Sequence, residues 1–511
     1  MKKIIPVLIF IFLPACFYFH TEVEELPVKD LMKSESYNIE SKTKVHLENG
    51  GLIVYPDGFV MQQDTLFGNG LLYNVLRDSS IEINTYPFDS TAFYEYYSNM
   101  YEPETTILTA PVAFMGTGLL MVAIFGSCPT IYSTEDTVSA LEAELFSYSV
   151  AEMFEQSDLD KLNYLTVKNN KTKLLLTNEA LETHYIDKLA LGIVEHNKNY
   201  QAFPTDEEEV LLVGEYANPI HVENRKHESI EKLVTNKDSL FYETDSLLLK
   251  ELTNRITSDW IDLEYDIPPG KEEAVVVVNY KNTLLNTILL YDVMLGSQGA
   301  EAVDWIGDKT DNLWYAYNFD KWYRSHFGIH VKVFDGDEYT EVYRLSDTGP
   351  ITWHESAFEI EIPEVNKLKL RLEFLPDNFK IDQVNVSFDL SEDYEYKEIN
   401  VSEMTNNHNS QKVASLLLND DDEEYFITHP GDSYNLIFDT PPCPGNKVQS
   451  YFVSSNGYYV EWIRKDWIKN GLQLNKGIVF DYNDDAIKRT AEIWLSKRAT
   501  FEKLFLEKKV K

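Results

Sequence analysis

The stretch Lys369-Leu370-Arg371-Leu372-Glu373-Phe374 alternates charged and apolar residues without a break. Successive side chains of a β-strand point to opposite faces, so this period of two predicts a strand with one buried face. Asp262-Leu263-Glu264-Tyr265-Asp266 and Ile329-His330-Val331-Lys332-Val333 show related patterns, and Ala274-Val275-Val276-Val277-Val278 is a short apolar run. With turn residues at Asp335-Gly336-Asp337, these runs predict a sandwich or jelly-roll arrangement.

Further strands are expected on the N-terminal side of this block. Alternating runs between residues 44 and 86 are separated by Asn49-Gly50 and Asp57-Gly58, which favour tight hairpin turns. Strand-like runs return between residues 162 and 213. The predicted fold class is therefore mainly β, with several sandwich-like or jelly-roll-like domains.

The C-terminal segment has a different period. From Asp484 to Lys509 the apolar residues recur close to every 3.6 positions, which predicts an amphipathic α-helix. Asp484 and Asp485 lie at its start and Lys508 and Lys509 at its end, so both ends suit the helix dipole. We expect this helix to dock on the acidic body of the protein; an external partner is the alternative.

Composition restricts the class of partner. The 511 residues include 84 acidic and 45 basic side chains, for a net charge of −39. Such a chain repels phosphate backbones and anionic lipid surfaces, so we expect no nucleic-acid partner. Hydrophobic residues make up 44%, which is enough apolar material for several packed cores.

The N-terminus has the pattern of an export signal. Lys2 and Lys3 precede the apolar residues 4–13, and Leu13-Pro14-Ala15-Cys16 follows. These four residues resemble the lipobox of bacterial lipoproteins, which implies lipid attachment at Cys16 and anchoring to a membrane. The expected location is the bacterial cell envelope, at the outer membrane, facing the periplasm or the cell surface. An ordinary signal peptide with an incidental cysteine is the alternative.

A second apolar segment covers residues 105–134, which carry no charged side chain. Its length approaches that of a membrane span, but both flanks are acidic and no Lys or Arg sets an orientation. We therefore favour a buried or membrane-dipping segment over a span.

The sequence predicts seven consecutive parts. They are a signal peptide (1–15), a tether with a small β module (16–104), the apolar segment (105–134), a β-rich domain (135–222), a polar helical or loop connector (223–255), a β-sandwich-like domain (256–400) and a C-terminal β and loop region with the terminal helix (401–511).

One motif carries a family likeness. Ser127-Cys128-Pro129-Thr130-Ile131-Tyr132, followed by Leu141-Glu142-Ala143-Glu144-Leu145-Phe146, resembles a group of uncharacterised bacterial envelope proteins with a Ser-Cys-Pro-x-[Val/Ile]-Tyr pattern. The Trp-Asp-Gly that often follows the tyrosine in that group is replaced by Ser133-Thr134-Glu135-Asp136. The resemblance implies topology and location, and it implies no activity.

No motif identifies a catalytic centre, a metal site or a cofactor. Asp481 to Glu492 has acidic residues at calcium-loop spacing, but Ala486 occupies the position where the sharp turn needs glycine. His326 and His330 are too far apart along a strand to share one ion. Cys128 and Cys443 either form a disulfide or remain two free thiols, because spacing alone does not decide pairing.

Aromatic residues concentrate within the block predicted to be β-rich. Trp305, Trp314, Trp322 and Trp353 are candidate ligand-binding residues, because exposed aromatic rings stack on sugars or anchor protein partners. The alternative is that they fill a sandwich core. The function expected is a non-catalytic binding module for a protein or a glycan. The alternatives are a hydrolase acting on envelope or extracellular polymers, and a structural component of a membrane-associated complex.

Overall fold

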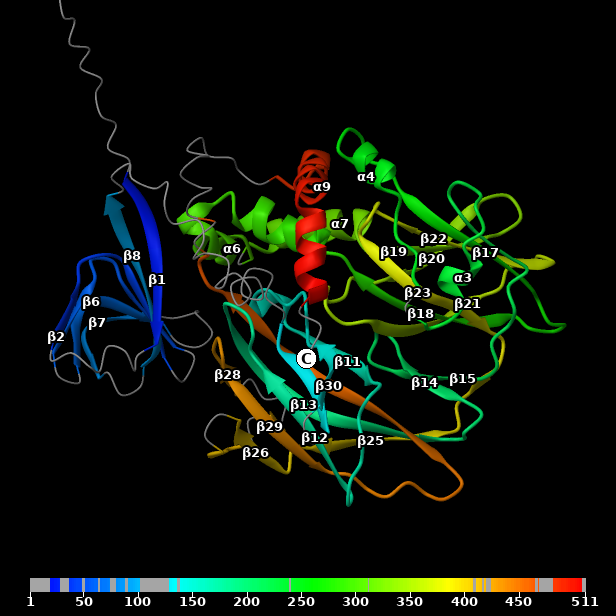
Figure 1. The fold of residues 1–511 in the computed structure, drawn as a ribbon, viewed down its shortest axis with the longest axis horizontal. Helices are drawn as coiled ribbons and strands as arrows, with labels where there is room; N and C mark the ends of the chain where they lie inside the picture. Colours follow the sequence, from blue (N-terminus) through cyan, green and yellow to red (C-terminus); the bar gives the residue numbers. More distant parts are fainter. Residues whose placement is uncertain are drawn as a thin grey trace, which may run out of the picture.

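The computed structural model describes most of the chain from residue 19 to residue 507. The described residues are 19–27, 36–47, 51–62, 65–73, 80–87, 91–101, 128–135, 138–238, 240–310, 312–407, 410–415, 418–419, 424–464, 467 and 481–507. Their strands form six sheets, and the longer helices gather in one region (Figure 1). The mainly β class with a C-terminal helix is confirmed.

An eight-stranded antiparallel sheet forms the N-terminal part, drawn in blue in Figure 1. Its strands are β1 (Phe19–Pro27), β2 (Ser36–Ile39), β3 (Thr43–Leu47), β4 (Leu52–Tyr55), β5 (Phe59–Gln62), β6 (Thr65–Tyr73), β7 (Ser80–Pro87) and β8 (Thr91–Tyr101). Val45, Ile53 and Leu66 belong to its buried core. The sheet contacts the rest of the protein, because His46 stacks on Trp462 with 4.3 Å between the ring centroids.

The first sandwich packs a six-stranded sheet against a five-stranded sheet. The six-stranded sheet contains β9 (Thr130–Glu135), β10 (Val138–Glu144), β12 (Lys171–Thr177), β26 (Glu403–Asn406), β27 (Lys412–Val413) and β29 (Ser433–Asp439). The five-stranded sheet contains β11 (Gln156–Leu162), β13 (Glu182–His196), β25 (Tyr394–Asn400), β28 (Phe426–Thr428) and β30 (Val448–Glu461). Leu174 and Leu436 from one sheet meet Leu189 and Val453 from the other in a shared core.

The second sandwich contains the strands that the alternating and apolar sequence runs between residues 262 and 374 predict. Its five-stranded sheet contains β16 (His221–Asn224), β17 (Asp259–Asp266), β19 (Ile329–Phe334), β20 (Tyr339–Leu345) and β22 (Lys367–Phe374), and its three-stranded sheet contains β18 (Glu273–Asn282), β21 (His354–Glu361) and β23 (Phe379–Ser387). Buried and partly exposed side chains alternate along β17 and β22, as their period of two predicts.

A small sheet of β14 (Gln201–Pro204), β15 (Val210–Val213) and β24 (Leu390–Ser391) covers the outer face of β18. Val276 and Val278 face the core of the second sandwich, whereas Val275 and Val277 pack against this small sheet. Strand β18 is therefore buried on both faces, which is why its sequence is apolar without alternation.

The remaining elements are helical. They are η2 (Glu152–Phe154), α3 (Glu231–Val234), α4 (Ser246–Leu252), α5 (Leu285–Ile288), η3 (Leu289–Leu295), η4 (Gly299–Glu301), α6 (Ala302–Thr310), α7 (Leu313–His326) and α9 (Asp484–Glu507). Ile487 and Trp494 of α9 are buried against α4, α5 and η3, and the Trp494 indole N–H donates to Asp377 Oδ2 at 2.6 Å. The predicted C-terminal helix therefore docks on the body, as expected.

One prediction needs correction. The sequence predicts that the β-rich block continues between β18 and β19, but 285–326 are mostly helical (Figure 1). These helices pack against one another around a common core, and that packing stabilises them. The packing outweighs the preference of their many aromatic residues for strands. Of the two alternatives that the sequence leaves open for the cysteines, the structure has two free thiols, with Cys128 buried and Cys443 exposed.

Two predictions concern residues that lie wholly or mainly outside the described ones. These are lipid attachment at Cys16 and the greater part of the apolar segment 105–134. Within the described part of the chain, every helix falls short of the length or the hydrophobicity that crossing a bilayer requires.

Candidate ligand cavity

A cavity of about 360 Å³ lies where the first sandwich, the helices and the β20–β21 loop (346–353) meet. Its apolar wall comes from η3, α6 and α7 and includes Leu290, Met294, Trp305 and Phe319. Its polar wall comes from the end of β10, the turn that follows it and the β20–β21 loop. Ligand pockets are commonly ~300–1,000 Å³ and mostly apolar with a few polar groups, so this cavity suits a small ligand.

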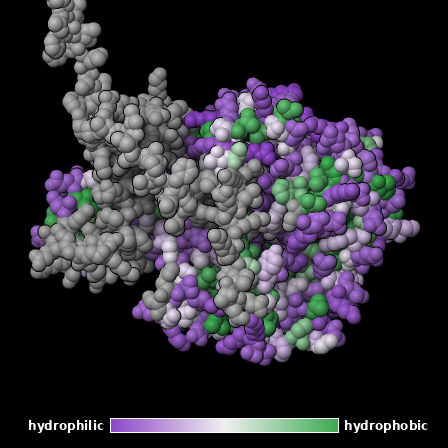
Figure 2. Space-filling view, in the orientation of Figure 1, coloured by the Kyte–Doolittle hydropathy of each residue, from purple (hydrophilic) through white to green (hydrophobic). Residues whose placement is uncertain are grey.

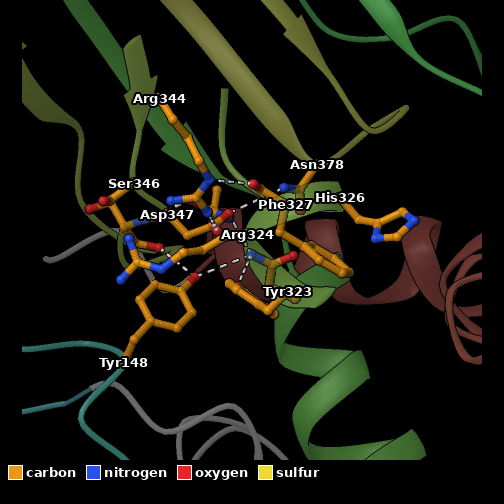
Figure 3. Close-up of polar contacts among 12 residues, drawn as sticks. Tyr148, Tyr323, Arg324, His326, Phe327, Arg344, Ser346, Asp347 and Asn378 are labelled. Atoms are coloured by element: carbon orange, nitrogen blue, oxygen red, sulfur yellow. Dashed lines mark hydrogen bonds and ion pairs between the residues drawn. The ribbon is translucent and has the colours of Figure 1, made fainter. Parts of the chain in front are cut away.

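Asp347 holds the β20–β21 loop in place. Its Oδ1 accepts hydrogen bonds from the side-chain amides of Asn282 at 2.8 Å, Asn286 at 2.7 Å and Asn378 at 3.3 Å. The Arg344 guanidinium lies 3.6 Å from its Oδ2. Figure 3 shows Arg344, Asp347 and Asn378 converging. Because these partners come from separate segments, the carboxylate ties the loop to the rest of the second sandwich.

Two tyrosines reach this network from opposite elements. Tyr148, in the turn after β10, donates to the Thr348 carbonyl at 3.0 Å, and Tyr323 of α7 accepts from the Asn286 amide at 3.1 Å. Figure 3 shows both rings pointing toward the Asp347 network, while His326 points away from it. The tyrosines thereby join the first sandwich and α7 across the cavity.

Glu144 lies at the polar end of the cavity and is only 4% exposed. Its Oε2 accepts from the backbone N–H groups of Ile351 and Thr352, both at 2.8 Å, and from the Thr352 hydroxyl at 3.2 Å. Burial raises the pKa of this carboxyl to about 7, although the bonds from Thr352 and Ile351 favour its charged form. Its other oxygen, Oε1, has no hydrogen-bond partner among the described residues.

The helix η3 has π geometry, and this geometry places Tyr291. The Gly296 N–H donates to the Tyr291 carbonyl at 2.9 Å, a bond that spans five residues instead of four. A Cβ on Gly296 would lie 2.7 Å from that carbonyl oxygen, so only glycine fits without a shift. Tyr291 lines the cavity, and its hydroxyl reaches a second buried group of acids.

This second group contains Glu182 and Glu461, which lie opposite each other on β13 and β30. The Tyr291 hydroxyl is within hydrogen-bond distance of both carboxyl groups, and Arg464 contacts Glu461 at 2.8 Å. The hydroxyl has one hydrogen, so it can donate to only one of the two carboxyl groups at a time. Burial raises the pKa of Glu182 to about 7 and that of Glu461 to about 8, although Arg464 favours their charged forms.

Several polar atoms of the cavity-lining residues have no hydrogen-bond partner among the described residues. They are Glu144 Oε1, Asn286 Oδ1, Asp347 Oδ2 and the Tyr315 hydroxyl. Each of these atoms is buried, so a ligand in the cavity would reach it only after the surrounding side chains shift.

The four tryptophans that the sequence offers as candidate ligand-binding residues lie in different environments. Trp305 of α6 lines the cavity, whereas Trp314 of α7 is 74% exposed. Trp322 packs among the helices, and Trp353 packs against Phe241. None of the four belongs to the core of either sandwich as the described residues define those cores. The core alternative is therefore wrong for all four, and Trp305 is the one that the structure brings to the cavity.

Comparisons with known proteins assign no family. No protein-family model matches the chain, and no curated protein matches it. Solved structures that are similar include an allantoicase (11% identity, 48% of this chain and 90% of that chain, TM-score 0.17). An α-xylosidase from Xanthomonas citri is 8% identical over 85% of this chain and 36% of that chain, with a TM-score of 0.16. TM-scores this low support neither a shared fold nor a shared activity.

Proposed function

We propose that this chain is a lipid-anchored envelope protein that binds a small saccharide, or the end of a glycan, in the cavity. The observation that carries the proposal is a cavity that aromatic side chains line on one side and polar side chains on the other. A sugar ring has apolar faces, which stack on aromatic side chains, and a rim of hydroxyl groups, which donate to oxygen acceptors.

The aromatic wall supplies the stacking surface. Trp305 and Tyr315 stand edge to face with their ring centroids 6.4 Å apart, and both line the cavity. Phe319 and Tyr323 follow one and two turns further along α7 and also line it. Because these rings come from two packed helices, the wall is held by secondary structure rather than by a loop.

The position of the carboxyl groups favours binding over hydrolysis. A glycosidase commonly needs two carboxyl groups on either side of the bond that it breaks. Asp347 is engaged by three amides and Arg344, and Asp320 by Arg324 at 2.8 Å. Glu155 accepts from the Tyr425 hydroxyl at 3.0 Å, and Glu144 is held by the Ile351 and Thr352 amides, so each lining carboxyl is engaged by the protein. Hydrolysis, and a role as a structural component of a membrane complex, stay predictions of the sequence.

The anchor rests on the pattern Leu13-Pro14-Ala15-Cys16. We expect Cys16→Ser to move the protein from the membrane fraction to the soluble fraction of the envelope, because an unacylated chain loses its hydrophobic attachment. Mass spectrometry of the wild-type N-terminus should find an acylated Cys16. An unmodified cysteine, or an uncleaved leader, would contradict the lipid anchor and would leave the proposal of a saccharide cavity unaffected.

Binding is tested with a panel of mono- and disaccharides, measured by calorimetry on the wild type and two matched variants. Trp305→Ala removes a ring from the cavity wall, and we expect it to weaken saccharide binding about tenfold or more. Trp314→Ala removes the same ring from an exposed position, and we expect affinity within about twofold of the wild type.

Two outcomes would contradict the proposal. In the first, no saccharide in the panel binds. In the second, Trp314→Ala weakens binding as much as Trp305→Ala does, which would place the site on the outer face of α7. That face also exposes Leu313 and Tyr317 and would then fit a protein partner better.

A further inference from the structure

Three basic side chains line the cavity, and two of them are paired with carboxylates that also line it. Arg324 lies 2.8 Å from Asp320, and Arg344 lies 3.6 Å from Asp347. The third basic side chain is Lys309 of α6. Among the described residues, no carboxylate oxygen lies within 4 Å of its ammonium nitrogen. Lys309 is therefore the lining cation whose charge these residues leave uncompensated at short range.

The other two lining carboxyl groups are held by uncharged donors. Glu144 Oε2 accepts from the backbone N–H groups of Ile351 and Thr352, both at 2.8 Å, and Glu155 accepts from the Tyr425 hydroxyl at 3.0 Å. Burial raises the pKa of Glu144 to about 7, so this carboxyl carries only part of a negative charge at neutral pH. Both groups are thus bound by the wall itself, and neither forms an ion pair with the lining lysine.

The fold places the Lys309 ammonium beside the proposed stacking surface. Lys309 follows Trp305 by four residues, so the two side chains share one face of α6. The ammonium nitrogen lies 5.1 Å from the centroid of the Tyr315 ring, and Trp305 meets the same ring edge to face at 6.4 Å. All three residues are partly exposed, and all three line the cavity. A ligand that stacks on this aromatic pair therefore has the ammonium as a direct neighbour.

Acidic residues on the adjoining described segments do not neutralise this lysine. Asp304 of α6 lies 3.7 Å from the Lys44 ammonium of β3. Asp481 interacts with the Tyr315 hydroxyl, and more than 4 Å separates its carboxylate from the Lys309 ammonium. The Tyr315 ring attracts the cation through its face, but it leaves the three ammonium N–H groups able to donate to an anion.

We propose that the Lys309 ammonium binds the anionic group of an acidic saccharide, a carboxylate or a sulfate ester, while the sugar ring stacks on Trp305. This inference rests on the proposed saccharide site. An ammonium group has donors only, and anionic oxygens are the strongest acceptors for it. Arg324 adds positive charge to the same lining. Its Nε donates to both oxygens of Asp320, at 2.8 and 3.0 Å, and its two terminal nitrogens have no hydrogen-bond partner in the described part of the chain.

The charge of the whole protein limits the size of the expected effect. A net charge of −39 repels anions at long range. Salt screens this repulsion beyond ~8 Å at physiological ionic strength, so a charge at contact distance decides between an acidic and a neutral sugar. Because the lysine is partly exposed, we expect the acidic form to bind about fivefold more tightly than the neutral form.

The experiment uses matched triplets of one ring: glucose, glucuronate and glucose 6-sulfate, and the corresponding galactose series. Calorimetry at about pH 7 in low salt should show the carboxylate or the sulfate of at least one series binding about fivefold more tightly than its neutral form. Comparison of the two acidic forms identifies the anion. Lys309→Gln should bring the ratio of acidic to neutral affinity to about one, whereas Lys309→Arg keeps the charge and should retain the preference.

Added salt separates a direct ion pair from a change in the fold. The wild type and Lys309→Gln share every other charge, so their difference in affinity for the acidic sugar should shrink as salt is added. A difference that salt leaves unchanged would contradict an ion pair and would assign Lys309 a structural role.

Lys321→Gln is the control for the loss of a lysine. Lys321 of α7 is exposed, lies outside the cavity lining and has no ion pair among the described residues, so this variant should keep the preference for the acidic sugar. Equal binding of acidic and neutral sugars, or a preference that survives in Lys309→Gln, would overturn the inference and leave the saccharide site standing. Absence of binding across all the sugars would overturn both.

Discussion

The two sandwiches both enclose apolar cores, but they differ in how they treat buried acids. In the second sandwich, Asp259 accepts hydrogen bonds from the hydroxyls of Tyr242 at 2.9 Å and Thr244 at 2.7 Å and from the Trp260 N–H at 2.9 Å. In the first sandwich, Glu144 keeps an open oxygen, and Glu182 and Glu461 share one tyrosine hydroxyl.

This difference helps to distinguish buried acids that only hold the fold together from buried acids that lie close to the candidate site. A buried polar group whose bonds are complete makes a structure specific, whereas an incomplete one is costly unless something else completes it. Incomplete groups occur in the second sandwich as well, since the side-chain amide of Asn279 on β18 has no hydrogen-bond partner among the described residues. What distinguishes the first sandwich is that one of its incomplete groups, Glu144, lines the cavity.

The largest expected effect is on the scaffold. Phe374→Ala removes a fully buried ring from the core of the second sandwich and should lower the free energy of unfolding by about 3–5 kcal/mol. Because this cost comes from packing, it should be similar at about pH 5.5 and about pH 8.5. Urea unfolding at both pH values checks it. A loss that changes strongly with pH would show that titratable groups stabilise this sandwich as well.

The next effect concerns the proton on the buried Glu461 carboxyl of the first sandwich. Burial raises the folded-state pKa of Glu461 to about 8, well above its ordinary value of 4.5. The stabilisation linked to its proton is therefore fully present below about pH 4.5 and is lost as the pH rises through about 8. Glu461→Gln carries no proton to lose. Between about pH 5 and pH 9 the variant should gain roughly 4 kcal/mol relative to the wild type.

Urea unfolding of the wild type and of Glu461→Gln across this pH range provides the measurement. A constant difference between wild type and Glu461→Gln at every pH would show that Glu461 is ionised throughout, with Arg464 as its sufficient partner.

A smaller effect tests the helix that joins the two regions. Gly296→Ala places a Cβ 2.7 Å from the Tyr291 carbonyl and should cost about 1–2 kcal/mol, since η3 must shift. Gly307→Ala is the matched control, because a Cβ on Gly307 of α6 meets nothing within 4 Å. It should be neutral or stabilising by up to about 1 kcal/mol. Equal effects of the two changes would contradict the role of the π geometry.

The smallest effect belongs to the outer face of the second sandwich. Arg371 donates two bonds of 2.8 Å to Asp262, on strands β22 and β17, and both side chains are partly exposed. Asp262→Asn should cost no more than about 1 kcal/mol, and added salt should reduce the difference. A loss of several kcal/mol would show that surface pairs matter here as much as core packing.

Local sequence patterns predict the parts of the fold that are locally determined. Strands β17, β19 and β22 follow from alternation, and α9 follows from its 3.6-residue period and its end charges. The helices η3 and α7 could not be predicted in this way. Residues 313–326 are rich in Trp, Tyr and Phe, which are weak helix formers. This segment is helical because packing against the rest of the protein stabilises the helix.

The site is harder to predict than the fold. Glu144 is one of 84 acidic residues, and its hydrogen-bond partners Ile351 and Thr352 lie 207 and 208 positions further along the chain. No spacing rule links residues so far apart. The aromatic cluster gave a useful signal, since it contains Trp305, but it could not distinguish a cavity wall from the exposed Trp314. Figure 2 shows one face with hydrophobic side chains in small, separate groups, so surface hydropathy on that face does not mark the site either.

The most direct test is an experimental structure of the protein soaked with the saccharide that binds best. The account predicts that the sugar ring lies in the cavity against Trp305. A sugar bound elsewhere, with the cavity closed by the protein's own side chains, would contradict it.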